Sequence, residues 1–182
     1  MAINSKKKGS RFERVISKWF SDWSGFKFER NRAGSGAWHS NKDAGADITC
    51  TDEKHAHRCK VSIECKSYKD IRFEHILLDN KKCDILKFWV QAWTDANRTK
   101  KIPMLCMRYN SMPRNEFFIV VDGKLAEVFL SNSSDMHVMD IKSPLLKNNK
   151  IYVFRATEVF KNVSYKDIHK QAKNICRIMY KV

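Results

Sequence analysis

The chain has 182 residues, of which 43% are hydrophobic and 12% aromatic, a length and composition typical of one globular domain with a hydrophobic core. They exclude an intrinsically disordered protein, and no apolar run approaches the roughly 20 residues of a membrane span. The segment "MAINSKKKGS" lacks the apolar stretch of a secretory signal, so we expect a cytoplasmic protein without a membrane partner. Lys and Arg outnumber Asp and Glu by 35 to 20, and the net charge of +15 favours nucleic acid as the partner.

The first half of the chain predicts one helix and three strands. Residues 1–9 are strongly basic and are expected to form a mobile tail. Ser10 is a plausible N-cap for a helix with apolar residues at helical spacing, and Gly25 can end it. Strands are expected in "FKFERNRAG", "ADITC" and "KVSIECKSY". A Gly/Ser/Asn-rich loop follows the first strand, and a polar turn over 51–60 pairs the other two as antiparallel neighbours.

The second half predicts a crossover onto the same sheet. A helical period covers residues 82–97, and strands are expected in "MLCMRY", "EFFIVVDG" and "IYVFRA". Ser164 is expected to open a last helix that runs through Tyr180. Residues 110–150 are expected to elaborate the core. Residues 123–149 are polar and lack a clear pattern, and they are expected to be an insertion or an irregular excursion. We therefore expect one α/β domain over 1–182, with a mixed central β-sheet flanked by helices.

Six cysteines are present without any C-x-x-C spacing, which predicts reduced, packed thiols in place of disulfides. A zinc site is the one alternative to consider, because His55, His57, Cys59 and Cys65 are close in sequence. Their spacing matches no common zinc pattern, so this alternative is disfavoured.

The segment "VSIECKSYKD" places two opposite charges in an apolar strand. Side chains on a strand alternate between its faces, so Glu64 and Lys66 share one face while Ile63 and Cys65 share the other. For an isolated E-x-K the simpler interpretation is an ion pair on the surface.

Asp47, in "GADIT", changes that interpretation. If the two neighbouring strands pair, Asp47 lies next to Glu64, and the repulsion between their carboxylates favours a bound divalent cation. Oxygen ligands select Mg²⁺, with Mn²⁺ as a substitute, and the backbone carbonyl of Cys65 is a further ligand. Lys66 would orient the attacking water and stabilise charge on a phosphate, which is the chemistry of phosphodiester hydrolysis.

Five segments together resemble the PD-(D/E)xK nuclease superfamily, and within it the archaeal-type Holliday junction resolvases. They are "KKKGSRFERVISKWF", "RNRAGSG", "GADI", "IECKSYKD" and "WVQAW", in that order over residues 6 to about 108. The resemblance implies a restriction-endonuclease-like fold and a homodimer that makes paired nicks in four-way DNA junctions. Two departures are Ala46, where the family has proline, and the long stretch 110–150.

The resemblance also implies roles for particular residues. Asp47 and Glu64 would bind Mg²⁺ with the Cys65 carbonyl, and Lys66 would be the catalytic lysine. Glu13 would join the metal site directly or through water, although it also has the position of a capping-box residue of Ser10.

The remaining implied residues lie on a loop, a helix and the basic surface. Ser35 would contact the scissile region, unless it is a simple loop hydroxyl, and Gln91 would support the active site, unless it is an exposed helix residue. The basic residues expected to contact DNA are Lys6, Lys7, Lys8, Arg11, Arg30, Arg32 and Lys69. No small-molecule cofactor is expected.

Three functions remain in competition. The first is a Mg²⁺-dependent endonuclease that resolves four-way junctions. The second keeps the chemistry but acts on flaps or duplex DNA, since a fold does not determine its substrate. The third is a catalytically silent module that binds nucleic acid.

Overall fold

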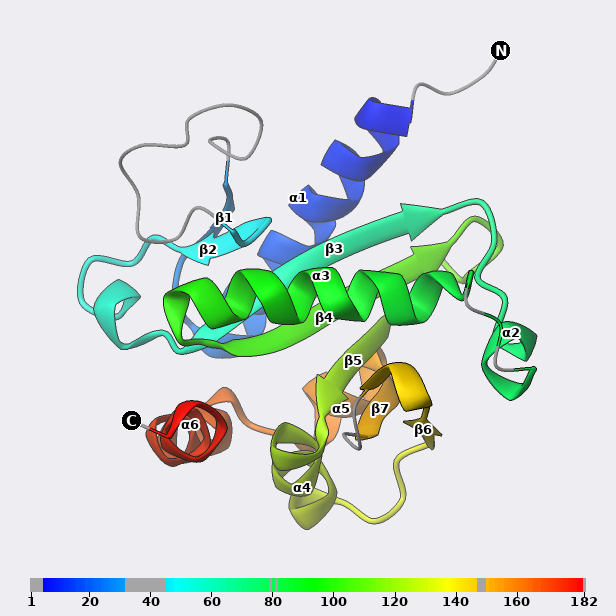
Figure 1. Ribbon diagram of the computed structural model, residues 1–182. Coiled ribbons are helices and arrows are strands. Elements are labelled where there is room, and N and C mark those ends of the chain that lie inside the picture. Colours follow the sequence, from blue (N-terminus) through cyan, green and yellow to red (C-terminus); the bar gives the residue numbers. More distant parts are fainter. Residues whose placement is uncertain (1–4, 32–44, 79, 81, 147–149, 182) are drawn as a thin grey trace.

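One mixed sheet organises the protein (Figure 1). The computed structural model describes residues 5–31, 45–78, 80, 82–146 and 150–181. The helices are α1 (Ser5–Ser24), η2 (Ala56–Arg58), α2 (Glu74–Leu77), α3 (Asp84–Thr99), α4 (Gly123–Asn132), η3 (Pro144–Leu146), α5 (Ala156–Asn162) and α6 (Tyr165–Tyr180). The strands are β1 (Phe28–Arg30), β2 (Ile48–Cys50), β3 (Val61–Tyr68), β4 (Ile102–Tyr109), β5 (Phe118–Asp122), β6 (Val138–Lys142) and β7 (Lys150–Arg155).

The described strands form a 7-stranded sheet in the order β1-β2-β3-β4-β5-β7-β6. Strands β3 and β4 are parallel and are joined by the crossover through α3, whereas the other neighbours are antiparallel. The expected antiparallel pair of β2 and β3 and the expected crossover are both confirmed. The architecture is the α/β, restriction-endonuclease-like one that the sequence predicts.

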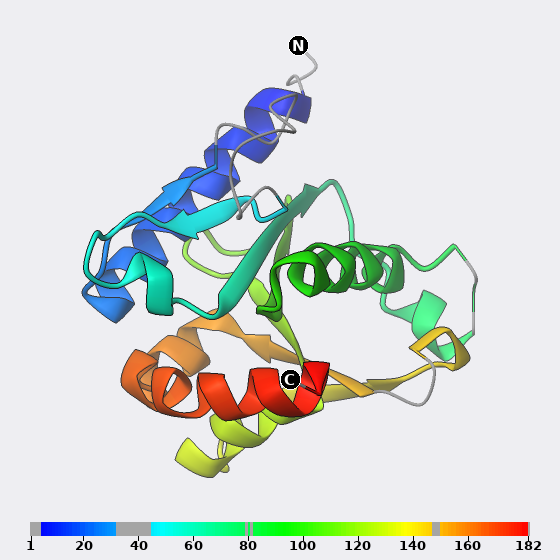
Figure 2. The same ribbon diagram turned by 60° about the vertical axis from the view of Figure 1, so that its left-hand side comes forward.

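Helices cover both faces of the sheet (Figures 1 and 2). One hydrophobic cluster joins α1, α4, α5 and α6 to one face, and a second joins α3 to the other. Strand β3 contributes Val61, Ile63 and Cys65 to the first cluster, as the alternation of side chains predicts. Glu64 and Lys66 consequently face α3.

Helix α1 differs from its prediction at its beginning. The buried Phe12, Ile16 and Phe20 form its apolar face, and Gly25 follows its end with a φ of 73°, where a left-handed glycine is favoured. The helix begins at Ser5, so the expected basic tail over 1–9 is wrong for residues 5–9, and Ser10 lies inside the helix and does not cap it. Lysine is a good helix former, and the run of lysines before Gly9 therefore extends the helix.

Residues 110–150 contain regular structure. They supply the central strand β5, helix α4 and edge strand β6, so the expected irregular excursion over 123–149 is wrong for most of its length. Asp122 caps α4 by accepting a hydrogen bond from the N–H of Leu125 at 3.0 Å. Ser164 caps α6 in the same way, through the N–H of Asp167 at 3.3 Å, as predicted.

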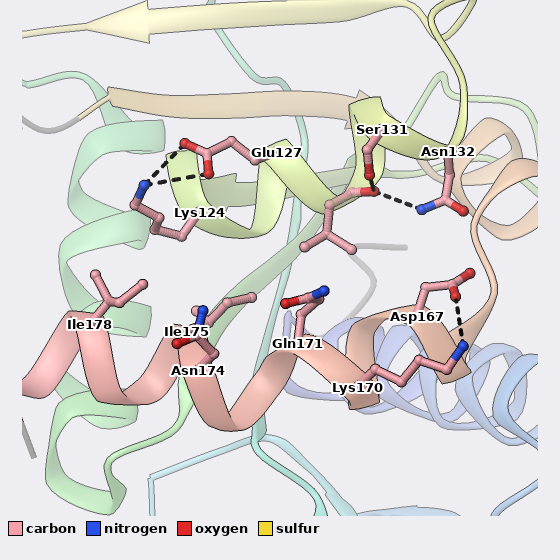
Figure 3. A pocket seen from close by; sticks show the side chains of 11 residues that line it. Lys124, Glu127, Ser131, Asn132, Asp167, Lys170, Gln171, Asn174, Ile175 and Ile178 are labelled. Atoms are coloured by element: carbon pink, nitrogen blue, oxygen red, sulfur yellow. Dashed lines mark hydrogen bonds and ion pairs between the residues drawn. The ribbon is translucent and has the colours of Figure 1, made fainter.

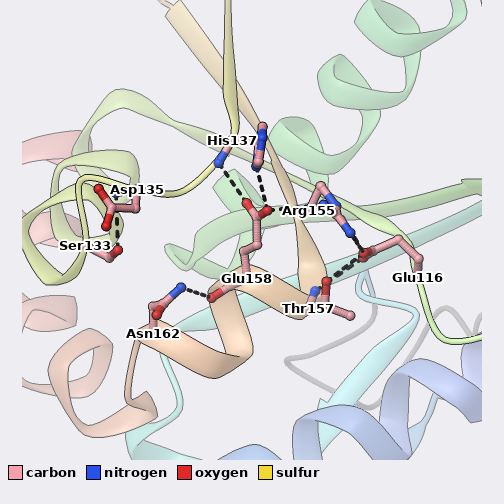
Figure 4. Close-up of polar contacts among 8 residues, drawn as sticks. All are labelled: Glu116, Ser133, Asp135, His137, Arg155, Thr157, Glu158 and Asn162. Carbon is pink, nitrogen blue, oxygen red and sulfur yellow. Dashed lines mark hydrogen bonds and ion pairs between the residues drawn. The ribbon is translucent and has the colours of Figure 1, made fainter.

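A buried carboxylate joins β7 and α5 to the start of β5 (Figure 4). Glu116 accepts hydrogen bonds from the Thr157 hydroxyl at 2.6 Å and from Nη2 of Arg155 at 3.1 Å. Arg155 also pairs with Glu158, which accepts a hydrogen bond from the N–H of His137 at 2.7 Å. Although burial acts in the opposite direction, these donors hold the pKa of Glu116 below its ordinary value.

The cysteines are free thiols, and all except the half-buried Cys176 are buried, as expected. The disfavoured zinc site has no counterpart among the described residues, which contain no converging set of three metal-binding side chains. His55 stacks on Phe26 instead, with ring centroids 3.8 Å apart. Within the described part of the chain, no helix combines the length and the apolar character needed to span a membrane.

Candidate active site

Strand β3 carries a buried ion pair on the face that α3 covers. Nζ of Lys66 lies 2.7 Å from Oε1 of Glu64, and the two side chains are only 19% and 5% exposed. Lys66 also lies over the ring of Phe88 on α3, 5.9 Å from its centroid. The prediction that Glu64 and Lys66 share a face is confirmed, and their burial distinguishes them from a surface ion pair.

Asp47 lies beside this pair because it precedes β2, which runs antiparallel to β3. Its N–H donates to the Ile63 carbonyl at 3.0 Å, and its Oδ2 accepts from the Cys65 N–H at 2.8 Å. The N–H and C=O of one strand residue point toward the same neighbour, so the Cys65 carbonyl also points toward the side of Asp47. Two carboxylates and one carbonyl are thus available on this side of β3.

Both carboxylates resist ionisation. Burial and then the charge of Asp47 raise the pKa of Glu64 to about 8, although Lys66 opposes the shift. Burial also raises the pKa of Asp47, against the hydrogen bond from Cys65. Burial by itself lowers the pKa of Lys66, but the attraction of Glu64, the hydrogen bond to it and the charge of Asp47 together raise that pKa above its ordinary value. A divalent cation would relieve the repulsion between the two carboxylates.

Helix α3 adds two polar side chains one turn apart. Gln91 is exposed on the helix, and its Nε2 donates to Oε1 of Glu64 at 2.8 Å, so it contacts the candidate site. Asp95 lies four residues later on the same helix face. After burial and Asp47, its charge is a further cause of the raised pKa of Glu64. Sequence reasoning missed Asp95, although its spacing from Gln91 was the available signal.

A glycine lets the chain before Asp47 approach α3 closely. A Cβ atom added to Gly45 would lie 2.9 Å from Cβ of Asp95, a distance that real side chains essentially never show. Asp95 itself is held by an ion pair with Arg98 at 3.1 Å. The small residue in "GADI" therefore has a steric reason, which is the packing of the Asp47 segment on α3.

Glu13 reaches the candidate site from α1. Its charge is one of the influences that raise the pKa of Asp47, after burial as the main cause. Its carboxylate forms an ion pair with Arg30, whose Nη2 donates to the Ser10 hydroxyl at 3.0 Å. The capping-box alternative for Glu13 is wrong, because Ser10 lies within α1.

The residues expected to contact DNA lie mostly around the start of α1 and the end of β3. Lys7, Arg11 and Lys69 are exposed, and Arg30 is engaged by Glu13. Lys8 is half-buried at the end of β3. Lys6 belongs to α1, and its side chain is not described. Ser35 and Arg32 lie outside the described residues.

The donor set fits a hard cation, although no three acidic or cysteine or histidine side chains converge within the described residues. Asp47 and Glu64 provide carboxylate oxygens, and the Cys65 backbone provides a carbonyl on the same side. Such oxygen donors suit Mg²⁺, which keeps several waters and takes only one or two carboxylates from a protein. Water and the substrate would supply the remaining ligands, which agrees with this preference of Mg²⁺.

The hollows found on the described surface lie away from these residues. One, of about 410 Å³, separates α4 from α6 and is mostly polar (Figure 3). Another, of about 790 Å³, lies between α3, α4 and β7 and includes Trp93 and Tyr152. Neither is lined by Asp47, Glu64 or Lys66.

A mixed sheet with Asp47 before one strand and Glu64-Cys65-Lys66 in the next has the arrangement of a PD-(D/E)xK nuclease. The chain belongs to the family described as "phage putative PDDEXK endonuclease", whose model matches residues 4–174. This membership supports a nuclease. Comparisons with curated proteins and with solved structures give no match.

Proposed function

We propose that this protein is a Mg²⁺-dependent endonuclease that hydrolyses phosphodiester bonds in branched DNA, with the four-way junction as its preferred substrate. The observation that carries the chemistry is the convergence of Asp47, Glu64 and the Cys65 backbone beside the buried Lys66. The junction preference is supported by the likeness of the sequence segments to archaeal-type resolvases. Mn²⁺ is proposed to substitute for Mg²⁺.

Each residue of the site has a proposed role. Asp47, Glu64 and the Cys65 carbonyl would hold the cation, with Glu13 reaching it directly or through water. A bound Mg²⁺ would activate water and stabilise charge on the phosphate. Lys66, kept protonated beside Glu64, donates hydrogen bonds from Nζ that orient the attacking water or neutralise a phosphate oxygen.

Two further residues support this centre. The Gln91 amide donates to Oε1 of Glu64, which fixes the orientation of that carboxylate. Ser35 is proposed to contact the scissile region of the DNA. The predicted basic residues of α1, β1 and the end of β3 are proposed to bind the phosphate backbone. Two copies of the chain would act together as a homodimer, one active site on each of two opposing strands.

The decisive experiment is cleavage of a synthetic four-way junction whose arms cannot migrate. Wild-type protein with Mg²⁺ is expected to make paired nicks, whereas Asp47→Asn and Glu64→Gln bind the junction and leave it intact. A matched control is Glu127→Gln, which removes a carboxylate from the exposed surface of α4 and is expected to cut normally. Equal cutting by wild type and both site variants would refute the mechanism.

Competition among substrates tests the finer part of the proposal. A labelled junction is mixed with an excess of unlabelled junction, flap or linear duplex, and the unlabelled junction is expected to compete best. Preferential competition by flap or duplex would replace the junction preference while leaving the nuclease intact. Absence of both cleavage and calorimetric Mn²⁺ binding would identify a silent DNA-binding module.

A further inference from the structure

A basic pair lies where β3 ends, on the face of the sheet that α1 covers. Nζ of Lys8, in the first turns of α1, donates to the backbone carbonyl of Tyr68 at 2.7 Å. This contact ties the beginning of α1 to the last residue of β3. This hydrogen bond places the half-buried Lys8 at the end of β3.

Arg108 reaches the same place from β4. Met104 and Cys106 belong to the hydrophobic cluster on the α1 face, so the alternation along β4 places Arg108 on that face as well. Its Nη2 donates to the Met112 carbonyl at 3.2 Å, and its Nη1 lies 3.4 Å from the Arg114 carbonyl. The turn after β4 thus orients a guanidinium that still has donors for a further acceptor, since arginine carries five N–H groups.

Lys8 and Arg108 lie at the same end of the β3–β4 pair, because Arg108 is opposite Ser67 and Lys8 contacts the next residue, Tyr68. Partial burial, followed by the charge of Arg108, lowers the pKa of Lys8. The carboxylate of Asp70, on the loop after β3, forms an ion pair with Arg72 at 3.6 Å. The hydrogen bonds of Lys8 and Arg108 go to backbone carbonyls, which engage some of their N–H donors but do not neutralise their charges, so an anion placed between them would stabilise both.

We infer that Lys8 and Arg108 together form a phosphate-binding subsite for the DNA backbone, separate from the site of hydrolysis. Tyr68 lies four residues beyond Glu64, about 13 Å along an extended strand. The subsite would therefore bind a phosphate other than the scissile one. It rests on the proposed function, because it takes DNA as the ligand, and it adds Arg108 to the residues that bind the substrate.

The alternative is that Arg108 only fastens the turn after β4 and Lys8 only fastens α1. Salt dependence separates the two, because each phosphate contact contributes about 0.9 to the slope of log K against log salt concentration. We expect Arg108→Gln to reduce that slope by about one and to weaken binding about eightfold at 0.1 M salt. Lys8→Gln should act similarly. The double variant should lose less binding free energy than the sum of the losses of the two single variants, because both cations contact one phosphate.

The measurement is fluorescence anisotropy of a labelled four-way junction and of a labelled duplex, in EDTA, between 0.05 and 0.3 M salt. The matched controls are Lys173→Gln and Arg177→Gln, which remove the same charges from the exposed surface of α6. Thermal unfolding identifies any variant that fails to fold. If Arg108→Gln fails to fold, Lys8→Gln, which changes a residue on the helix surface, still tests the subsite.

The outcomes distinguish this inference from the proposed function. A slope for Arg108→Gln and Lys8→Gln equal to that of wild type and the α6 controls would refute the subsite even if the wild-type protein cleaves junctions. A reduced slope in a protein that never cleaves DNA with Mg²⁺ would support the subsite and refute the nuclease proposal.

Discussion

Two pairs of like charges lie along β3, and they differ in sign and in position. Asp47 and Glu64 are close at the middle of the strand, and Lys8 and Arg108 are close at its end. Burial and a like neighbour disfavour the charged forms of Asp47, Glu64 and Lys8, so a ligand of opposite charge would stabilise each pair. A cation for the first pair and a phosphate for the second are the two ligands that a metal-dependent nuclease brings together.

Glu116 provides the contrast within the same molecule. Arg155 and Thr157 satisfy it from inside the protein, and the pKa of Glu116 is lowered where that of Glu64 is raised. Both carboxylates are buried, and both have a basic partner at hydrogen-bond distance. At Glu64 burial, followed by the charge of Asp47, raises the pKa, whereas at Glu116 the donors of Thr157, Arg155 and Phe117 together outweigh burial. The carboxylate with the raised pKa thus belongs to the candidate site, and the one with the lowered pKa belongs to a hydrogen-bond network that is complete within the protein.

The largest expected effect comes from removing the positive charge of Lys66, the basic partner of Glu64. Lys66→Met should lower the rate of junction cleavage by about 10² to 10⁴-fold, because the charge and the proton at Nζ act on the reacting groups. Calorimetry should show retained Mn²⁺ binding, since the substitution removes a positive charge next to the metal ligands. Lys173→Met on α6 serves as the control. Cleavage within tenfold of wild type would contradict the role given to Lys66.

Glu116 tests the structural side of the contrast. Glu116→Ala should lower the free energy of unfolding by about 2 to 3 kcal/mol, because Arg155 and Thr157 lose their common acceptor. Urea denaturation measures the change, and Glu116→Gln, which keeps an acceptor oxygen, should lose less. The cleavage rate of the folded fraction should be unchanged for both variants. A loss of cleavage without loss of stability would contradict the structural role given to Glu116.

Gln91 should have an intermediate effect. Gln91→Ala removes the hydrogen bond to Oε1 of Glu64 and should lower cleavage or metal affinity about 10 to 100-fold. The neighbouring Val90 is exposed on the same helix, and Val90→Ala should leave cleavage unchanged. Equal activities of Gln91→Ala and Val90→Ala would show that Gln91 does not support the active site.

The sequence predicted the acidic pair better than the basic one, for a physical reason. The placement of Glu64 and Lys66 follows from the two-residue period of a strand, and the position of Asp47 follows from a hairpin with a short connection. Lys8 and Arg108 meet only through the packing of α1 on the sheet, and the expected tail at residues 1–9 concealed that contact. The pairing of Glu13 with Arg30 and the position of Asp95 likewise depend on tertiary packing that local patterns do not encode.

The smallest expected effect concerns stability without metal. Because the folded-state pKa of Glu64 is raised to about 8, its contribution to stability is complete below its unfolded-state pKa and is lost as the pH rises through 8. Asp47, whose pKa is also raised, adds to this loss. Asp47→Asn removes the like charge while its side-chain oxygen can still accept from the Cys65 N–H. We therefore expect the variant to be more stable than wild type by about 1 kcal/mol at pH 8.5, and by less at pH 5.

Urea denaturation in EDTA at the two pH values measures this difference, and His titrations common to both proteins cancel from it. Mg²⁺ should reverse the order at pH 8.5, because a cation bound by the folded state stabilises wild type more than the variant with one carboxylate fewer. Identical pH dependence of the two proteins in EDTA would mean that the acidic pair is not strained by its own charges. The raised pKa of Glu64 would then reflect burial alone, and the parallel with Lys8 and Arg108 would fail.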